Sequence, residues 1–309
     1  MIAFIFPGQG SQKVGMGKAL AEAFPICRET FEQADRALGE PLSGLIFDGP
    51  EEMLMLTEHT QPAVLAVSIA ACRFLESNGM VPHFVAGHSL GEYSANVAAG
   101  TFEFGDALKL VRRRGRYMQE SVPVGEGAMA AILGLDATEV ERACVEAADG
   151  EVVSAANFNG AGQIVIGGAR EAVKRAGERA KALGAKRVVP LSVSAPFHTA
   201  LMAPAQERLA PELRALATHM PRVPIIANVD AAPKHDASAA VEALVRQVSA
   251  PVRWQAVVER LASEGVTTYV EVGPGTVLSG LVRKIHRDAI CVNFGSPDDL
   301  IAVESAIKA

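Results

Sequence analysis

The stretch HFVAGHSLGEYSANVAAG, His83 to Gly100, decides how the rest of the chain is interpreted. Its apolar start ends at Gly87, Ser89 follows between two glycines, and a run of helix-forming residues comes next. The pattern Gly-x-Ser-x-Gly between a strand and a helix predicts a sharp turn, because small flanking residues let the two elements approach closely. Such a turn holds the serine oxygen at the carboxyl end of the strand, beside the positive end of the helix dipole. Ser89 is therefore a candidate nucleophile; the alternative is a glycine-rich turn whose serine only caps the helix.

The segments on both sides of this turn alternate between strands and helices. Short continuous apolar runs predict buried strands at 2–6 and 83–87. Helical patterns follow at about 16–23, 30–38, 61–78, 93–99 and 104–120. After residue 194 the alternation returns, with helices in 199–216, 239–249, 254–265 and 276–285 and strands in 223–230, 267–275 and 289–294. This alternation favours a parallel sheet with helices on both faces.

Between these two regions the pattern changes at Pro123. It predicts a strand in 122–134, a helix in 136–148 opened by a capping Asp136, and strands in 151–159 and 162–168 joined by a turn at Asn159-Gly160. A helix in 169–184, ended by Gly184, and a strand in 185–193 complete the order β-α-β-β-α-β. This is the split βαβ pattern of a ferredoxin-like unit. The sequence therefore predicts an α+β subdomain, residues 124–193, inserted into a large domain made of residues 1–123 and 194–309.

The composition of the chain indicates which partners and which cellular compartment to expect. The chain has 309 residues, is 49% hydrophobic and 21% charged, and has a net charge of −6 without a basic block, which argues against nucleic acid as a partner. The four cysteines (Cys27, Cys72, Cys144 and Cys291) lack metal-ligand spacing and are predicted to be reduced core thiols. The first apolar run is too short to cross a bilayer and has no positive residues before it, so we expect a cytoplasmic protein without membrane association.

A serine nucleophile needs a base, and the chain has seven histidines. His286 is the late candidate in the order serine, acid, histidine of α/β-hydrolases, but it lies at a charged helix end. His88 is adjacent to Ser89 in sequence, so its side chain is expected to point elsewhere and to serve packing or hydrogen bonding. His198 follows a predicted strand and opens a predicted helix, which suits a base. Spacing alone leaves the choice open, and no carboxylate stands out as a third member.

Several short motifs occur in one order along the chain: FPGQGSQ (6–12), QPAV (61–64), GHSLGEYSA (87–95), RRRGRYMQ (112–119), SAPFH (194–198), QVSAPVRW (247–254) and VEVGPG (270–275). Together they resemble the malonyl-CoA:acyl-carrier-protein transacylases of fatty acid synthesis and the acyltransferase domains of polyketide synthases. The resemblance runs from residue 4 to about residue 281. The expected fold class is α/β: a large α/β-hydrolase-like domain with a parallel sheet, plus the inserted ferredoxin-like α+β subdomain, which this family also has.

The resemblance implies roles that spacing does not. Ser89 would take the malonyl group from coenzyme A as an ester, and His198 would act as general base and then as the acid for the leaving thiolate. In this family a backbone carbonyl, at the position of Gln247, takes the place of a triad carboxylate. The oxyanion hole would be formed by the backbone N–H groups of Leu90 and Gln9. An alternative for the PGQG segment around Gln9 is a plain turn.

Two further positions bear on the choice of substrate. The arginine run Arg112, Arg113, Arg114 and Arg116 would ordinarily be a solvated face with ion pairs, yet neighbours on a helix point in different directions. The resemblance implies that Arg114 points into the pocket and binds the malonyl carboxylate through its planar fork. It also implies that Phe197, before the base, selects malonyl over methylmalonyl groups, since the matching position in methylmalonyl-selective enzymes tends to be serine.

The expected function is transfer of malonyl from malonyl-CoA to the phosphopantetheine thiol of acyl carrier protein by a ping-pong route, without a metal or redox cofactor. A serine hydrolase and an idle acyl-thioester-binding scaffold are the alternatives. Arg114, the lone His198 and the missing acid argue against the hydrolase, and intact Ser89, His198 and Gln9 argue against the scaffold. The resemblance implies a monomer with a basic patch near the mouth for an acidic carrier. The pathway, fatty acid or polyketide, is open from the sequence.

Overall fold

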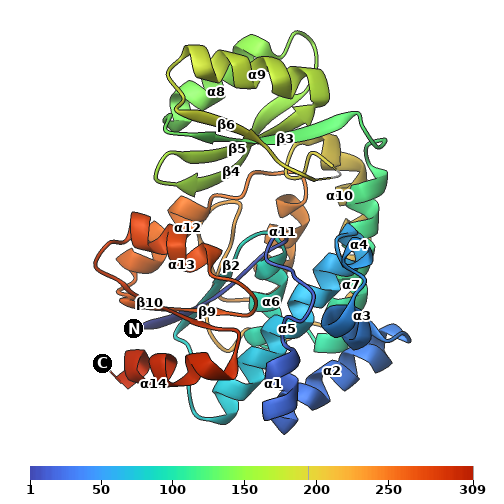
Figure 1. The fold of residues 1–309 in the computed structure, drawn as a ribbon, viewed down its shortest axis with the longest axis vertical. Coiled ribbons are helices and arrows are strands. Elements are labelled where there is room, and N and C mark those ends of the chain that lie inside the picture. Colours follow the sequence, from blue (N-terminus) through green and yellow to red (C-terminus); the bar gives the residue numbers. More distant parts are fainter. Residues whose placement is uncertain (194, 309) are drawn as a thin grey trace.

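The computed structural model describes residues 1–193 and 195–308, which form two β-sheets and the helices packed on them (Figure 1). The larger sheet has six strands in the order β10-β9-β1-β2-β7-β8. Neighbouring strands are parallel except β7 and β8, which are antiparallel. The strands are β1 Ile2–Phe6, β2 Phe84–Gly87, β7 Ile225–Ile226, β8 Pro233–Lys234, β9 Thr268–Val272 and β10 Ile290–Phe294.

Helices cover both faces of this sheet, as the continuous apolar strands require. Side chains alternate along β1, so Phe4 and Phe6 join one core, with α2, α5 and α7, while Ala3 and Ile5 join another, with α12 and α13. The helices are α1 Lys18–Ala23, α2 Pro25–Leu38, α3 Leu42–Asp48, α4 Glu51–Leu54, α5 Thr57–Ser77, α6 Leu90–Ala98, α7 Phe104–Glu120, α10 Ala203–Ala215, α11 Ala237–Gln247, α12 Trp254–Ser263, α13 Val277–Ile285 and α14 Leu300–Lys308.

Some helix boundaries differ from the predictions. α5 begins at Thr57 rather than at residue 61, and Pro62 lies inside it. Thr57 and Thr60 of the added turn are buried, and the hydroxyl of Thr60 donates to the carbonyl of Leu54 at 2.6 Å, so tertiary contacts outweigh the weak helix propensity of this segment. The short helices α3 and α4 and the C-terminal α14 were not predicted. α3 and α4 follow prolines, and their helical form depends on the packing of their own buried side chains, such as Ile46 of α3 and Leu54 of α4.

The two glycines of the elbow are required by close backbone contacts. A Cβ on Gly91 would lie 2.0 Å from the carbonyl oxygen of Phe6, and a Cβ on Gly87 would lie 2.0 Å from the carbonyl of Gly91. α6 therefore crosses directly over the ends of β1 and β2, and it begins at Leu90, three residues before the predicted start at residue 93. Ser89, between the glycines, has φ 53 and ψ −107, a conformation that a non-glycine residue rarely adopts.

The smaller sheet has four antiparallel strands in the order β4-β5-β3-β6. This order, together with helices α8 and α9, confirms the ferredoxin-like unit predicted from the β-α-β-β-α-β pattern. The prediction of a turn at Asn159-Gly160 is wrong. These two residues end β4, and Ala161-Gly162, with φ 52 and 70, make the turn to β5. The elements are β3 Gly127–Leu133, α8 Ala137–Ala147, β4 Val153–Gly160, β5 Gln163–Ala169, α9 Arg170–Ala182 and β6 Arg187–Pro190.

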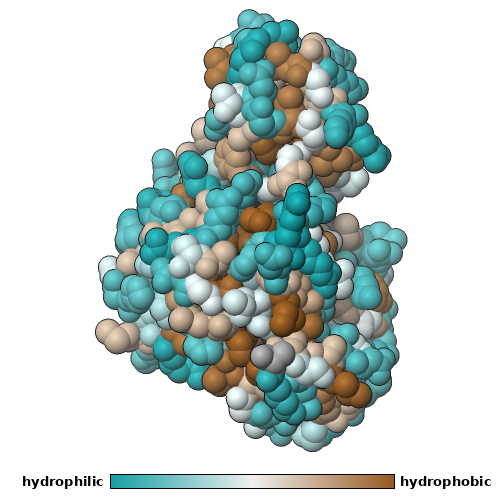
Figure 2. Space-filling view, turned by 90° about the vertical axis from the view of Figure 1, so that its left-hand side faces the viewer, coloured by the Kyte–Doolittle hydropathy of each residue, from teal (hydrophilic) through white to brown (hydrophobic). Residues whose placement is uncertain are grey.

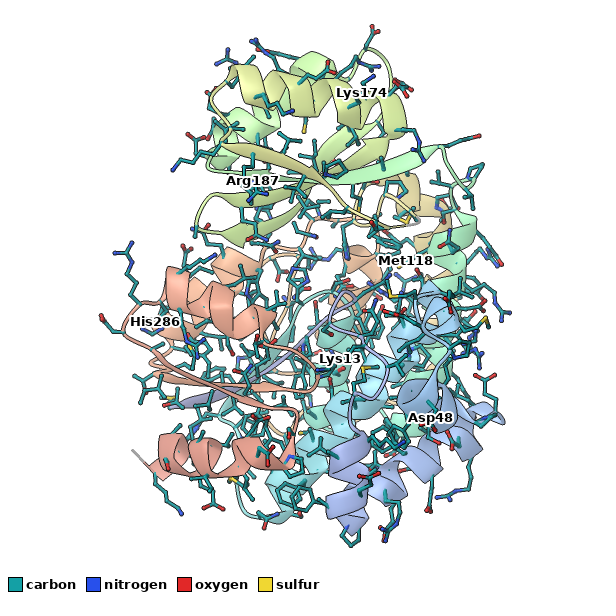
Figure 3. All side chains as sticks on the ribbon, in the orientation of Figure 1. Lys13, Asp48, Met118, Lys174, Arg187 and His286 are labelled. Atoms are coloured by element: carbon teal, nitrogen blue, oxygen red, sulfur yellow. The ribbon has the colours of Figure 1, made fainter. Side chains whose placement is uncertain are left out.

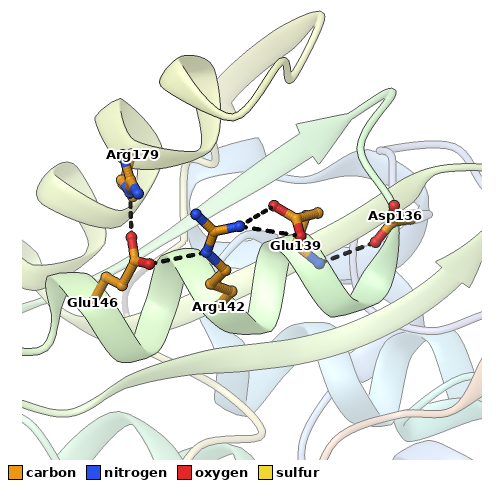
Figure 4. A network of polar contacts seen from close by, with 5 residues as sticks. All are labelled: Asp136, Glu139, Arg142, Glu146 and Arg179. Carbon is orange, nitrogen blue, oxygen red and sulfur yellow. Dashed lines mark hydrogen bonds and ion pairs between the residues drawn. The ribbon is translucent and has the colours of Figure 1, made fainter.

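A line of charged residues joins α8 and α9 on the outer face of the smaller sheet (Figure 4). Asp136 caps α8 as predicted, accepting the N–H of Glu139 at 3.0 Å. Arg142 pairs with Glu139 at 3.1 Å and with Glu146 at 2.9 Å, and Glu146 also pairs with Arg179. These side chains are exposed or half-exposed, so the pairs contribute little to stability, and the helices are held mainly by the apolar core beneath them.

The smaller lobe stands on the larger body, with a narrowing between them (Figure 2). Backbone hydrogen bonds cross this junction: Phe158 N–H donates to Val252 at 2.8 Å, and Val252 N–H donates to Ala156 at 2.9 Å. The inserted β4 is thereby tied to the segment that follows α11. The domain limits 1–123, 124–193 and 194–309 stay a prediction, and their boundary residue Ser194 lies outside the described residues. Across the described ranges, no helix is both long and apolar enough to span a membrane.

Candidate active site

A cavity of about 290 Å³ lies at the carboxyl ends of β1 and β2, beneath the smaller sheet. Its walls come from the loops that follow β1 and β2, from α5 and α7, and from β3 and β4 of the smaller sheet, so it forms where the inserted unit meets the larger body. In an α/β sheet, this end of the strands is where ligands usually bind. Among the residues that line it are Gln9, Gly10, Gln61, His88, Ser89, Leu90, Arg114, Met118, Met129, Asn157, Phe197 and His198.

Ser89 projects its hydroxyl into this cavity from the strained turn. Its Oγ lies 2.7 Å from Nε2 of His198, a hydrogen-bond distance. The turn itself is held by Asn228, whose side-chain oxygen accepts the N–H of Ser89 at 2.8 Å and whose side-chain nitrogen donates to Gly87 at 2.7 Å. One amide thus fastens both sides of the elbow, which stabilises the unusual backbone conformation of Ser89.

His198 is 3% exposed and has a positive φ of 61. Its Nδ1 lies 2.9 Å from the backbone carbonyl of Gln247, and since a carbonyl only accepts, Nδ1 carries the proton. Nε2 is then the unprotonated nitrogen and can accept the proton of the Ser89 hydroxyl. Burial, and to a lesser degree the positive charge of Arg114, lower the pKa of His198 to about 3. The imidazole is therefore neutral at physiological pH, the form that a base requires.

The four arginines of the run at residues 112–116 lie in different settings. Arg112, Arg113 and Arg116 form ion pairs with Glu40, Glu212 and Glu58 respectively. Arg114 instead is 2% exposed and lies in the cavity wall.

The guanidinium of Arg114 is bound by neutral groups. It donates to the side-chain oxygens of Gln61 and Gln247, each at 2.9 Å, and to Oγ of Ser89 at 3.2 Å. Its carbon lies 5.1 Å from the centre of the Tyr93 ring. Burial lowers the pKa of Arg114 from its ordinary value, yet an arginine remains charged at physiological pH. A cation held by neutral amides beside Ser89 can receive a carboxylate.

Two backbone N–H groups belong to residues that line the same cavity. Leu90 begins α6 directly after Ser89, and Gln9 lies in the loop after β1; both line the cavity. Within residues 1–193 and 195–308, no protein acceptor is found for the N–H of either residue. The side chain of Gln9 donates to the hydroxyl of Thr57 at 3.3 Å, which holds the loop. A pair of free N–H groups next to a nucleophile can stabilise an oxyanion.

The remaining wall is apolar. Phe197 is 9% exposed and lines the cavity with Met118 of α7 and Met129 of β3. Figure 3 shows Met118 between the larger body and the smaller lobe, at the level of this cavity. Methionine side chains adapt their shape, whereas the phenyl ring is rigid. Phe197 is thus the rigid apolar side chain in this part of the wall.

The other histidines considered from the sequence lie in different settings. His88 Nε2 contacts Asn159 Oδ1 at 2.9 Å, and burial lowers its pKa. This contact joins the elbow to β4, so His88 has the hydrogen-bonding place that was predicted. His286 Nδ1 lies 3.2 Å from the hydroxyl of Tyr269, on the α13 side of the larger sheet (Figure 3).

Sequence reasoning missed the polar residues that hold this site together: Gln61, Glu92, Asn228 and the side chain of Gln247. Gln61 and Glu92 lie within the motifs QPAV and GHSLGEYSA, yet nothing in their spacing indicates which atoms they contact. Asn228 follows the short strand β7, and its position at the carboxyl end of a predicted strand was an available signal.

Comparison with known proteins gives consistent results. A sequence model of the acyl transferase domain matches residues 3–294. The malonyl CoA-acyl carrier protein transacylase of Escherichia coli (strain K12) is 52% identical over 301 residues, 97% of each chain. The structure of an acyl carrier protein S-malonyltransferase from Vibrio cholerae superposes with a TM-score of 0.96 at 48% identity, covering 98% of this chain and 99% of that one. A malonyl-transacylase solved in complex with its type II PKS acyl-carrier protein superposes with a TM-score of 0.96 at 47% identity, covering 99% of each chain.

Proposed function

The chain belongs to the acyl transferase family, and from this premise we propose that it moves the malonyl group of malonyl-CoA to the phosphopantetheine thiol of acyl carrier protein through an ester on Ser89. The observation that carries the proposal is the buried Arg114, which donates to the hydroxyl oxygen of Ser89 at 3.2 Å while His198 contacts the same oxygen at 2.7 Å. A nucleophile, a base and a carboxylate receptor thus share one small cavity.

In the first half of the reaction, Ser89 Oγ attacks the thioester carbonyl carbon while its proton passes to Nε2 of His198. The carbonyl oxygen becomes negative and is stabilised by the N–H groups of Leu90 and Gln9. The carbon–sulfur bond then breaks, and the imidazolium returns its proton to the leaving thiolate of coenzyme A. The Gln247 carbonyl keeps Nδ1 protonated throughout and fixes the ring.

The second half is the reverse with a different thiol. The phosphopantetheine thiol of the carrier gives its proton to His198 and attacks the ester carbonyl, and Ser89 leaves with that proton. One site and one oxyanion hole serve both halves in turn, which gives ping-pong kinetics. The groups in this route are side chains, backbone N–H groups and one backbone carbonyl of the chain, so no metal or redox cofactor enters it.

The experiment that tests the proposal follows the fate of the malonyl group. Purified protein is incubated with labelled malonyl-CoA and a phosphopantetheinylated carrier protein, and the label is divided among carrier, enzyme and free malonate. We expect the label on the carrier. Label accumulating as free malonate would indicate a hydrolase, and label remaining on coenzyme A would indicate a scaffold.

Arg114→Ala should lower kcat/KM for malonyl-CoA about a hundredfold or more, because it removes charge-assisted hydrogen bonds of about 1.5–3 kcal/mol each. Acetyl-CoA carries no carboxylate, so its kcat/KM should be unchanged or raised. Arg114→Lys should rescue in part, since it supplies charge without the fork. The control is Arg113→Ala, whose side chain pairs outside the cavity with Glu212. Equal losses for both substrates in Arg114→Ala would make the arginine structural.

Phe197→Ser should narrow the preference for malonyl-CoA over methylmalonyl-CoA. The phenyl ring crowds a methyl branch at the α-carbon, and overpacking of this kind costs roughly 1–3 kcal/mol, enough for tenfold or more discrimination. The measurement is the ratio of kcat/KM for the two thioesters in both proteins. Equal values for the two thioesters in the wild type would remove Phe197 from the account of specificity.

We also propose that the protein is a cytoplasmic monomer. Its proposed large domain comprises residues 1–123 and 194–309, and its inserted subdomain comprises residues 124–193. The location rests on the four cysteines, which are free and buried. Neither nucleic acid nor a membrane has a role in the proposed reaction. A basic patch at the mouth would receive an acidic carrier, and the pathway that uses the product is open.

A further inference from the structure

Glu92 is a buried carboxylate that the proposed reaction does not use. It lies on α6 one turn after Ser89 and is 1% exposed. Its Oε2 accepts the N–H of Asn228 at 3.0 Å and the side-chain N–H of Gln247 at 2.8 Å. A buried carboxylate is costly unless it is hydrogen-bonded and compensated, so its presence beside the nucleophile calls for a role.

The first consequence of this carboxylate is the orientation of the Gln247 amide. Nε2 of Gln247 donates to Glu92 and to the backbone oxygen of Ser89 at 2.9 Å. Both partners only accept, so the nitrogen must face them and the amide oxygen must face the opposite way. On that side, the amide oxygen of Gln247 accepts a hydrogen bond from the guanidinium of Arg114 at 2.9 Å. One amide therefore connects the carboxylate to the cation.

The second consequence concerns charge. Arg112, Arg113 and Arg116 each pair directly with a glutamate, whereas in the described part of the chain no carboxylate forms an ion pair with Arg114. Glu92 is the buried carboxylate whose charge acts on Arg114, and each favours the charged form of the other. In the unloaded site, Glu92 thus compensates the guanidinium across the Gln247 amide.

We propose that Glu92 is a positioning residue whose ionisation opposes the binding of the malonyl carboxylate. This inference rests on the proposed function. Ionised Glu92 orients Gln247 and compensates Arg114 while the site is empty. When a substrate carboxylate reaches Arg114, two negative charges share one cation, and Glu92 takes up a proton from solvent. Transfer of the malonyl group to the carrier returns that proton.

The charges around Glu92 give this coupling its pH range. Burial raises the pKa of Glu92 to about 7, although the hydrogen bonds from Gln247 and Asn228 lower it. The negative charge of Asp230 raises the pKa of Glu92 further, and the positive charge of Arg114, the smallest of these influences, lowers it. The pKa of His198 is lowered to about 3 and that of Tyr93 is raised to about 12, so neither titrates near neutrality.

The sign follows from linkage. Malonyl affinity is highest where Glu92 is protonated, below its pKa, and falls as the pH rises through that pKa. Acetyl groups carry no charge and should show no such fall.

The test is the ratio of kcat/KM for malonyl-CoA to that for acetyl-CoA, from about pH 6 to about pH 8.5. Titrations shared by both substrates, such as that of His198, cancel in this ratio. In the wild type the ratio should fall roughly tenfold across the range, the size of ordinary coupling between charges in one network. In Glu92→Gln it should be flat, because the amide oxygen can accept both hydrogen bonds without titrating.

The matched control is Asp230→Asn, which removes a neighbouring carboxylate that pairs with Lys234 and Arg246. It should keep the slope, with the midpoint moved to lower pH because Asp230 raises the pKa of Glu92. Glu92→Asp retains a titrating group and should keep a slope if Glu92→Gln does not fold. A flat wild-type ratio, or a wild-type slope retained in folded Glu92→Gln, overturns the inference. Failure of the proposed function is a different result: no malonyl ester on Ser89 at any pH.

Discussion

Ser89→Ala is expected to abolish the covalent malonyl adduct while the protein stays folded. Alanine keeps the Cβ and removes the oxygen that contacts His198 and Arg114. Asn228 holds the elbow through the backbone of residues 87 and 89, so the loss of the hydroxyl leaves the turn in place. The measurement is trapping of labelled malonate on the protein, followed by peptide mapping.

The control for this variant is Ser94→Ala. Ser94 is buried on the same helix, and its hydroxyl has no hydrogen-bond partner among the described residues. It should be labelled at Ser89 at the wild-type rate. Labelled malonate found at any other residue of the Ser89→Ala protein would contradict the assignment of Ser89 as the nucleophile.

His198→Ala is expected to slow acylation by roughly 10²–10⁴, the usual contribution of a general base. The loss of His198 removes the acceptor for the serine proton, while Asn228 and Arg114 still hold Ser89. The measurement is the rate of the first turnover with malonyl-CoA.

His286→Ala is the matched control, because His286 was the rival base by sequence order and contacts Tyr269 instead. It should keep the wild-type rate. Wild-type speed in His198→Ala would require another base. Because the pKa of His198 is lowered to about 3, the base is protonated and loses its function only as the pH falls through that acidic range. The rate with acetyl-CoA, plotted against pH, should therefore show no ionisation of the base near neutrality.

The sequence predicts the architecture well because its signals are local. The strand at Ile2–Phe6, the helix at Phe104–Glu120 and the β-α-β-β-α-β order were read from periodicity, caps and turns. Its errors have tertiary causes. The first turn of α5 and the short α3 and α4 depend on packing, and the hairpin turn moves to Ala161-Gly162 while the Asn159 side chain contacts His88.

The candidate site is predictable only in part from local signals. The elbow at Ser89 is a local pattern, so its strand, turn and helix could be derived directly. His198 could not be chosen among the histidines by spacing, and the direction of Arg114 within its run came from resemblance. The contacts among Gln61, Gln247 and Glu92 join segments far apart in the chain, and only the folded structure brings their atoms together.

The central claim is that a malonyl ester on Ser89 is the intermediate of transfer, and intact-protein mass spectrometry tests it most directly. Wild-type protein given malonyl-CoA and freed of excess thioester should gain the mass of one malonyl group. Adding phosphopantetheinylated carrier protein should then return the enzyme to its original mass and place the malonyl group on the carrier. No gain in mass, or loss of the adduct as free malonate at the same rate with and without carrier, would contradict the account.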